Sequence, residues 1–156
     1  MQKITPFLWF DKEAEEAMNF YVSLFNGNPR KTNESRIVSV KRYPDGITEG
    51  PMAGMDGKVL TEVFELEGQR YMALDGGPIF KPNESVSFMV DCKDQEEIDY
   101  YWEKLSAVPD SEQCGWCKDK FGLSWQIVPE NMGELMQRPG AFAKMMQMHK
   151  IIIADF

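Results

Sequence analysis

The segment AEEAMNFYVSLF (14–25) is echoed by QEEIDYYWEKL (95–105), and this echo decides the fold that the sequence predicts. The matching residues share one offset of 81 positions: Glu15-Glu16, Phe20 and Leu24 correspond to Glu96-Glu97, Tyr101 and Leu105. Each copy follows an apolar, strand-like stretch and precedes a run of further strands. Self-similarity of this kind predicts two related modules, each made of a strand, a helix and further strands.

The first module is expected to span residues 3–80, with its first strand in 3–10. The helix that follows has an apolar face at helical spacing, formed by Ala14, Ala17, Met18, Tyr21, Leu24 and Phe25. Asp11 is predicted to cap this helix. The later elements are a strand in 34–43, a long glycine-rich loop in 44–57, and a hairpin of 59–68 with 69–75 that turns near Glu67-Gly68.

The second module, 84–130, is expected to begin with a strand in 85–92. Asp94 and Glu97 have the spacing of a capping box at the start of its helix. The remaining elements are the helix face Ile98, Tyr101, Trp102 and Leu105, two strands in 111–119 and 122–130, and a helical tail in 131–156. The predicted fold class is therefore α+β: one domain over residues 1–156, in which two βαβββ modules form a cupped mixed sheet with a C-terminal helical segment.

Four stretches carry a family resemblance: ITPFLWFDKEAEEAMNFY (4–21), VFELEGQRYMALDGGPIF (63–80), DQEEIDYYWEKLS (94–106) and CGWCKDKFGLSWQIVP (114–129). They resemble the PhnB-like branch of the glyoxalase/bleomycin-resistance/dioxygenase (vicinal oxygen chelate) superfamily, whose domain name is 3-demethylubiquinone-9 3-methyltransferase. One departure is Cys117, where that branch is expected to have leucine. The resemblance implies a glyoxalase-like fold whose sheets curl into cups that hold a small molecule, and a homodimer. The Met-rich C-terminal segment of this chain is one candidate dimer interface. The alternative is that its methionines pack in the core of the domain.

Composition and net charge limit the classes of partner and the cellular location that we expect. The formal net charge is -8, which repels phosphate backbones and anionic lipid heads, so neither nucleic acid nor membrane is an expected partner. The chain has no apolar run of transmembrane length and no signal-peptide pattern at its start, so a cytoplasmic location is expected. Its three cysteines are too few for a disulfide scaffold, which is consistent with the expected cytoplasmic location.

Strand alternation predicts which side chains line the cup. One face of each strand packs on a helix and the other faces the ligand. The expected ligand-binding residues are Thr5, Phe7, Trp9, Tyr71, Ala73, Asp75, Ser85, Ser87, Ser124 and Gln126. The helix-facing residues on the same strands are Ile4, Leu8, Phe10, Met72, Leu74, Val86, Phe88, Val90, Leu123, Trp125 and Ile127. A lining of hydroxyls, one amide and aromatic rings suits a neutral, mildly polar, partly planar small molecule.

The resemblance also places the metal positions of the superfamily, which are about Thr5, Ala73, Ser85 and Gln126 in this chain. Gln126 is the only ligand-like residue among them, and an amide oxygen alone does not hold catalytic Zn, Ni or Fe. The one histidine, His149, lies in the tail. No metal and no cofactor are therefore predicted.

No catalytic residue stands out from the sequence. Asp75 is a candidate general base at the cup rim, with an ordinary turn aspartate as the commoner interpretation. Glu62 is a second candidate that could also supply a metal ligand, although an edge-strand glutamate with a solvated carboxylate is favoured. Cys114 and Cys117 form a CxxC motif, but alternation puts them on opposite faces and turn and strand residues follow them, which disfavours a redox pair.

Three functions remain open. The first is a metal-independent small-molecule-binding protein of the resistance or sequestration type. The second is a metal-dependent enzyme of the lyase, isomerase or dioxygenase kind, acting on a small carbonyl or phenolic metabolite. The third is ubiquinone-related methyl transfer, which only the family name suggests, because the chain has no GxGxxG turn of the usual S-adenosylmethionine enzymes. Whether the chain is an enzyme is left undecided by the sequence.

Overall fold

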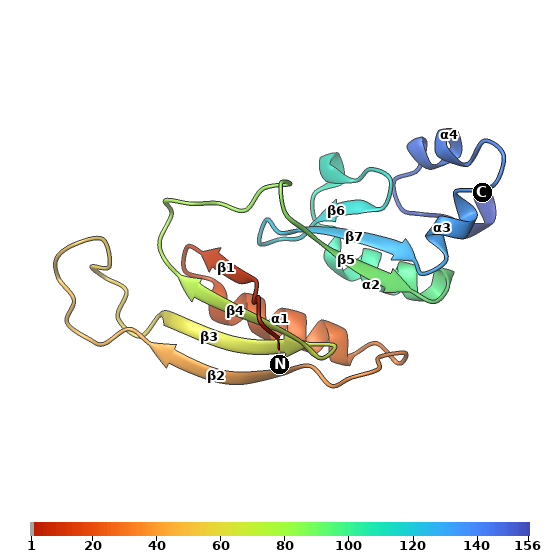
Figure 1. Ribbon diagram of the computed structural model, residues 1–156. Helices are drawn as coiled ribbons and strands as arrows, with labels where there is room; N and C mark the ends of the chain where they lie inside the picture. The colour runs from red at the N-terminus through yellow and green to blue at the C-terminus, as the bar shows by residue number, and fades with distance from the viewer. Residues whose placement is uncertain (1) are drawn as a thin grey trace. The chain divides into compact units, whose positions relative to one another are not determined.

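The computed structural model describes residues 2–156 (Figure 1). The chain divides into two compact units, residues 1–81 and residues 82–156. Among the described residues, no helix has the length and apolar character needed to cross a membrane.

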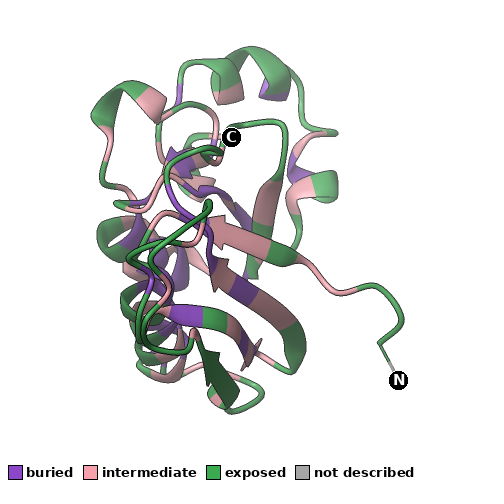
Figure 2. Ribbon diagram, turned by 90° about the vertical axis from the view of Figure 1, so that its left-hand side faces the viewer, coloured by how far each residue is buried: buried purple, intermediate pink, exposed green. Residues whose placement is uncertain are grey.

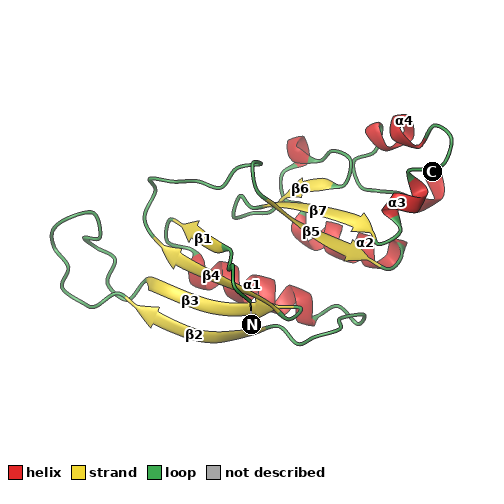
Figure 3. Ribbon diagram, viewed as in Figure 1, coloured by secondary structure: helices red, strands yellow, loops and turns green. Residues whose placement is uncertain are grey.

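The first unit is a four-stranded mixed sheet with one helix against it (Figure 3). Its elements are β1 (Phe7–Phe10), α1 (Ala14–Asn26), β2 (Arg36–Arg42), β3 (Val59–Leu66) and β4 (Gln69–Asp75). The strand order is β1-β4-β3-β2, with β1 parallel to β4 and the other neighbours antiparallel. β2 is the edge strand and is exposed along most of its length (Figure 2).

The helix α1 confirms its predicted apolar face. All six predicted residues are buried: Ala14, Ala17, Met18, Tyr21, Leu24 and Phe25. The β3–β4 hairpin also turns where it was predicted to turn. Glu67 and Gly68 both have positive φ, 50° and 83°, which is the conformation of a type I′ turn and explains the glycine.

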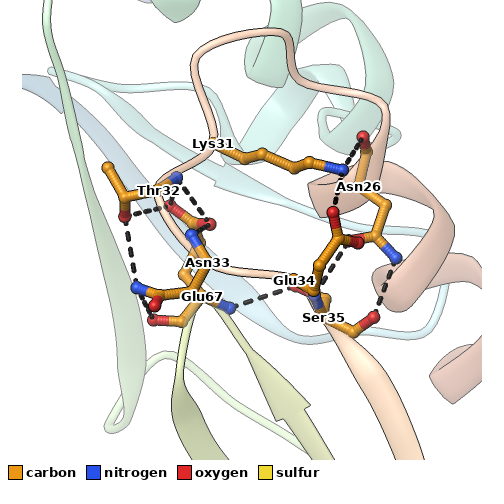
Figure 4. Close-up of polar contacts among 7 residues, drawn as sticks. All are labelled: Asn26, Lys31, Thr32, Asn33, Glu34, Ser35 and Glu67. Carbon is orange, nitrogen blue, oxygen red and sulfur yellow. Dashed lines mark hydrogen bonds and ion pairs between the residues drawn. The ribbon is translucent and has the colours of Figure 1, made fainter.

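Glu67 also fastens the segment that connects α1 to β2 (Figure 4). Its carboxylate accepts hydrogen bonds from the backbone amides of Thr32, at 3.1 Å, and Asn33, at 2.9 Å. Its own amide donates to the hydroxyl of Ser35, whose backbone is paired with the Asn26 side chain at the end of α1. The end of α1, the following loop and the hairpin turn are thereby held as one block.

The second unit has a three-stranded sheet in the order β5-β7-β6. Its elements are β5 (Ser87–Cys92), α2 (Gln95–Leu105), a 3-10 turn η1 (Pro109–Ser111), β6 (Trp116–Lys118), β7 (Ser124–Pro129), the short helices α3 (Met132–Leu135) and α4 (Ala141–Met146), and a second 3-10 turn η2 (Ile153–Asp155). The first strand again lies parallel to the last one. The helical C-terminal segment is as predicted.

The second unit has three strands, which fall in the expected ranges 85–92, 111–119 and 122–130 and are one fewer than a full βαβββ module has. The connection from α2 to β6 contains Pro109 in a 3-10 turn and only one isolated bridge, Gln113 with Trp116. A proline lacks the N–H that a strand ladder uses, which favours this turn over a strand.

The capping box of α2 is confirmed. Asp94 accepts the amide of Glu97 at 3.0 Å, and the Glu97 carboxylate accepts the amide of Lys93 at 2.8 Å. Three of the four predicted face residues, Ile98, Tyr101 and Leu105, are buried. Local sequence thus defines the start and the packed face of this helix.

Candidate functional site

The start of α1 is capped from a distant strand rather than from its own flank. Asp75, the last residue of β4, accepts the backbone N–H of Ala14 with Oδ1 at 2.9 Å and that of Val59 with Oδ2 at 3.0 Å. The predicted cap at Asp11 is wrong, because Glu13 occupies the N-cap position and makes no side-chain cap. Asp75 is buried, and burial raises the pKa of its carboxyl while the two backbone donors lower it. Asp75 is 1% exposed and each of its oxygens accepts a backbone N–H, so its carboxylate does not lie at an exposed rim.

Glu62 is the second buried carboxyl of the first unit. It lies on β3, between β4 and β2, and is only 1% exposed, so the favoured interpretation as a solvated edge-strand glutamate is wrong. Its Oε2 has no hydrogen-bond partner within residues 2–156. The pKa of Glu62 is raised to about 7, chiefly by burial and then by the charge of Glu15, with Arg42 lowering it and Asp75 raising it by smaller amounts. This carboxyl therefore changes charge near neutral pH.

The register of β4 corrects the predicted cup lining. Ala73 pairs with Glu62 and Leu8, and Asp75 pairs with Phe10, so these residues share one face of the sheet. The bond from Asp75 to the start of α1 identifies this face as the helix-covered one. Tyr71, Ala73 and Asp75 therefore point toward the side of α1, and the predicted orientation of β4 is wrong.

Residues on the opposite, open face of the first sheet follow from the same register. Met72 pairs with Phe7 and Leu74 with Trp9. Phe7 and Trp9 were predicted to lie on this face, and they do, whereas Met72 and Leu74 were predicted to pack on the helix. Apolar side chains thus occupy both faces of β4, which is why alternation alone misassigned it.

Trp9, near the end of β1, is fixed by a hydrogen bond and by contact with a second aromatic ring. Its indole N–H donates to the Gly77 carbonyl at 3.0 Å, and its ring meets Phe80 edge to face, with centroids 5.0 Å apart. A Cβ built on Gly76 would lie 2.2 Å from Cζ2 of Trp9, so the ring needs glycine at that position. Trp9 is half-buried and lies on the open face, while Thr5 precedes β1.

The open face of the second sheet carries a polar set of the predicted residues. Gln126 on β7 donates from Nε2 to the hydroxyl of Ser87 on β5 at 2.9 Å. Ser124 pairs with Ser87 in the strand register and is only 2% exposed, and its Oγ has no hydrogen-bond partner in the described chain. Leaving a hydroxyl buried and unpaired costs about 1–3 kcal/mol. The structure thus brings Ser87, Ser124 and Gln126 together, and Ser85 lies outside β5, exposed and bonded to Asn83.

The rim of this polar set contains a ring and an ion pair that the sequence did not single out as site residues. Trp116 on β6 lies opposite Gln126, and Lys118 lies opposite Ser124. Lys118 pairs with Glu84, and this pairing lowers the pKa of the Glu84 carboxyl. Met89, beside Gln126, is exposed. The pairing register, rather than any motif, places these residues around the serines.

The helix-facing side of the same sheet is core, as predicted for β7. Leu123, Trp125 and Ile127 are buried. The Trp125 indole donates to Asp119 at 2.9 Å, so this tryptophan is packed and satisfied. Val86 was predicted to pack on the helix and is exposed instead, because β5 begins only at Ser87.

Cys114 and Cys117 lie in different environments. Cys117 is buried opposite Trp125, and burial, followed by Asp119 and Glu112, raises the pKa of its thiol to about 12. A thiol with so high a pKa is almost wholly protonated at neutral pH and is a poor nucleophile. Cys114 is half-exposed, and both cysteines are free thiols.

The donors present do not match a superfamily-type metal site. Of the four implied positions, Ala73 faces α1, Thr5 and Ser85 lie outside strands, and only Gln126 has a ligating oxygen on an open face. Within residues 2–156, no group of three or more His, Cys, Asp or Glu side chains could hold a metal ion. The carboxylates of Asp75 and Glu62, which could have supplied ligands, are on the helix-covered side.

Comparison with known proteins places the chain by sequence. The family model of 3-demethylubiquinone-9 3-methyltransferase matches residues 2–128. A solved PhnB protein from Bacillus cereus, which carries the same family name, is 39% identical, with 81% of this chain and 99% of that chain covered and a TM-score of 0.63. Protein PA1353 from Pseudomonas aeruginosa, at 17% identity and a TM-score of 0.59 over 83% of this chain and 98% of that one, shows the same fold. Among curated proteins, none matches the chain.

Proposed function

The chain belongs to the 3-demethylubiquinone-9 3-methyltransferase family, the PhnB-like proteins, and from this premise we propose that it binds a small, neutral, polar molecule on the open face of the β5–β7–β6 sheet. The observation that supports this most is Ser124. Its buried hydroxyl lacks a partner in the described chain and lies on the face of the Ser87–Gln126 pair. A ligand atom that accepts from Ser124 would remove the cost of leaving this donor unpaired.

The polar atoms define the chemistry of the ligand. Ser124 and Ser87 each have a hydroxyl hydrogen to donate, since Ser87 accepts from Gln126 through its oxygen. With its Nε2 used on Ser87, Gln126 offers Oε1 as an acceptor. Trp116, the neighbour of Gln126 on β6, supplies a ring for contact with a flat group. A carbonyl beside an N–H or O–H donor, on a partly planar molecule, fits this set.

We also propose that binding needs no resident catalytic metal. Among the superfamily positions only Gln126 offers a ligating oxygen, and one neutral amide oxygen is too weak to hold a catalytic ion. The rival proposal is a metal-dependent enzyme acting on a small carbonyl or phenolic metabolite, for which Gln126 would be a ligand. Ser85, beside β5, stays a further candidate for contact with this ligand. In the first unit, Thr5, Phe7 and Trp9 stay separate candidates for binding a small molecule on that unit's own open face.

Methyl transfer, which the family name describes, is the least supported of the three activities. The usual S-adenosylmethionine enzymes bind their cofactor at a glycine-rich turn after the first strand of a parallel sheet. In this chain one strand pair of each sheet is parallel and the others are antiparallel, and no GxGxxG is present. Binding of S-adenosylmethionine would be required to restore this activity to first place.

We propose a cytoplasmic homodimer as the state in which the protein works. The C-terminal segment remains a candidate interface, because Phe142 on α4 is an exposed apolar side chain. Native mass spectrometry measures the subunit number directly, so the same experiment addresses this proposal and the ligand.

The test is native mass spectrometry of the purified protein, with and without a chelator. A metal-free dimer that carries a small co-purified mass is expected, and that mass would identify the ligand class. The variants S124A and Q126A should lose the mass, whereas Q147A, which removes an exposed glutamine from the end of α4, should keep it. A stoichiometric metal that the chelator removes, with turnover that stops in Q126A, would instead establish the metal-dependent enzyme.

A further inference from the structure

The turn before β6 is docked on the C-terminal segment of the second unit. Its backbone amides Cys114 and Gly115 donate to the carbonyls of Met148, at 2.9 Å, and His149, at 2.8 Å. The side chain of Gln113 donates to the Met146 carbonyl at 3.0 Å. Three backbone carbonyls of the C-terminal segment thus accept hydrogen bonds from residues 113–115, which hold the two segments side by side.

This docking brings two sulfur atoms together at the surface. Sγ of Cys114 lies 3.7 Å from Sδ of Met146, and both residues are accessible, with Met146 44% exposed. Cys114 has φ of 53°, a left-handed conformation that residues other than glycine rarely adopt. Asparagine or glycine would serve the turn with less strain, so a cysteine here is held at a conformational cost.

The two sulfur atoms are in direct contact, with the Cys114 thiol donating to Sδ of Met146, and the same separation allows both to bind one metal ion. Two bonds of about 2.3 Å at a tetrahedral angle place two sulfur ligands about 3.8 Å apart. From this geometry we infer that Cys114 and Met146 form a binding site for a soft monovalent cation, with Cu(I) as the physiological ion of that class. Binding replaces the thiol proton of Cys114, which is released to solvent, and needs no oxidant or reductant.

The donor types select Cu(I) over the harder ions. A thioether is a soft ligand that suits Cu(I) and contributes little to Zn²⁺, Mg²⁺ or Ca²⁺. His149, exposed on the same segment, is the imidazole available as a further ligand: Nδ1 lies 3.0 Å from the Glu112 carbonyl, which leaves Nε2 free of that bond. This site is separate from the serines and Gln126 of the open face and does not depend on the proposed function.

The other two cysteines serve as an internal contrast. Cys92 and Cys117 are buried, and burial raises the pKa of both thiols, so neither competes for a cation while the protein is folded. Binding to the folded chain should therefore depend on Cys114 alone among the thiols. This makes a single cysteine substitution decisive.

The experiment is anaerobic competition for Cu(I) between the full chain and the chromophoric chelator bicinchoninate. The wild-type chain is expected to take up one Cu(I) per chain. C114S should bind at least about 100-fold more weakly and M146L about 10-fold more weakly, because loss of even a hydrogen-bonded partner of a metal ligand costs about 10–100-fold in metal affinity. M136L, which replaces a half-buried methionine just after α3, is the matched control and should bind as the wild type does.

Circular dichroism and thermal unfolding of each variant establish whether it is folded. If C114S does not fold, M146L still tests the inference, because it keeps every thiol in place. Two results would overturn the inference. One is a wild-type chain that takes no Cu(I) from the chelator. The other is a folded C114S or M146L that binds Cu(I) as tightly as M136L does.

Discussion

Asp75 at the end of β4 accepts the backbone N–H of Ala14, the first residue of α1, at 2.9 Å across 61 positions of sequence. Its other carboxylate oxygen accepts the amide of Val59, the first residue of β3. Tyr43 closes the arrangement by donating its hydroxyl to the Asp75 carbonyl at 2.8 Å. The helix start, the base of the 44–57 loop and two strands thus converge on one buried residue, Asp75.

Replacing Asp75 should destabilise the first unit. D75A leaves two buried amide donors without partners, at about 1–3 kcal/mol each, so the free energy of unfolding should fall by about 2–6 kcal/mol. D75N keeps one acceptor oxygen and should lose less. Urea unfolding followed by circular dichroism measures both, with D45N in the exposed loop as the control. Equal unfolding midpoints for D75A and D45N would show that the carboxylate is dispensable.

The buried carboxyl of Glu62 should make the free energy of unfolding depend on pH. The pKa of its carboxyl is about 7 in the fold and 4.5 as an ordinary glutamate, so the folded state binds the proton more tightly than the unfolded state. Its contribution is fully present below pH about 4.5 and is lost as pH rises through about 7. Since one pKa unit corresponds to 1.36 kcal/mol, the loss is about 3 kcal/mol at most.

The variant E62Q, which stays neutral, should remove this dependence. It should match the wild type near pH 4.5 and exceed its free energy of unfolding by about 2–3 kcal/mol at pH 8. E49Q, at an exposed loop position, is the control and should keep the wild-type slope. Parallel wild-type and E62Q curves from pH 4.5 to 8 would contradict the burial of an ionisable carboxyl at this position.

Gly76 should be intolerant of a side chain because of Trp9. A Cβ there would lie 2.2 Å from the indole ring, so G76A must displace the ring or the backbone, and overpacking of this kind costs about 1–3 kcal/mol. G133A adds a methyl to open space in α3 and should be neutral or slightly stabilising. The double variant W9F/G76A should recover part of the lost stability, as measured by thermal unfolding, because the smaller phenylalanine ring leaves room for the added methyl group. A G76A protein as stable as G133A would refute this packing.

Several parts of the site followed from sequence because they depend on alternation within one strand and its neighbour. Ser87, Ser124 and Gln126 were assigned to one face from the apolar positions between them, and the register of β5 with β7 places them there. The same reasoning failed on β4, where apolar Met72 and Leu74 occupy the open face and Asp75 the helix-covered one. On β4 the helix-covered face contains a buried carboxylate and the open face contains apolar side chains, which reverses the usual pattern. No local sequence pattern reveals this reversal.

By itself the sequence determined the α+β class, the two amphipathic helices, the capping box of Asp94 and Glu97, and the hairpin turn at Glu67-Gly68. These features arise from side-chain periodicity and from interactions between residues a few positions apart, which a chain carries wherever it folds. The tertiary structure alone decided that Asp75 caps α1, that Glu62 is buried on β3, and that Cys114 lies against Met146. The first and last are contacts between residues 61 and 32 positions apart, and Glu62 is buried because β3 lies between β2 and β4. In each case packing, and not the neighbouring sequence, decides which group satisfies or isolates the polar atom.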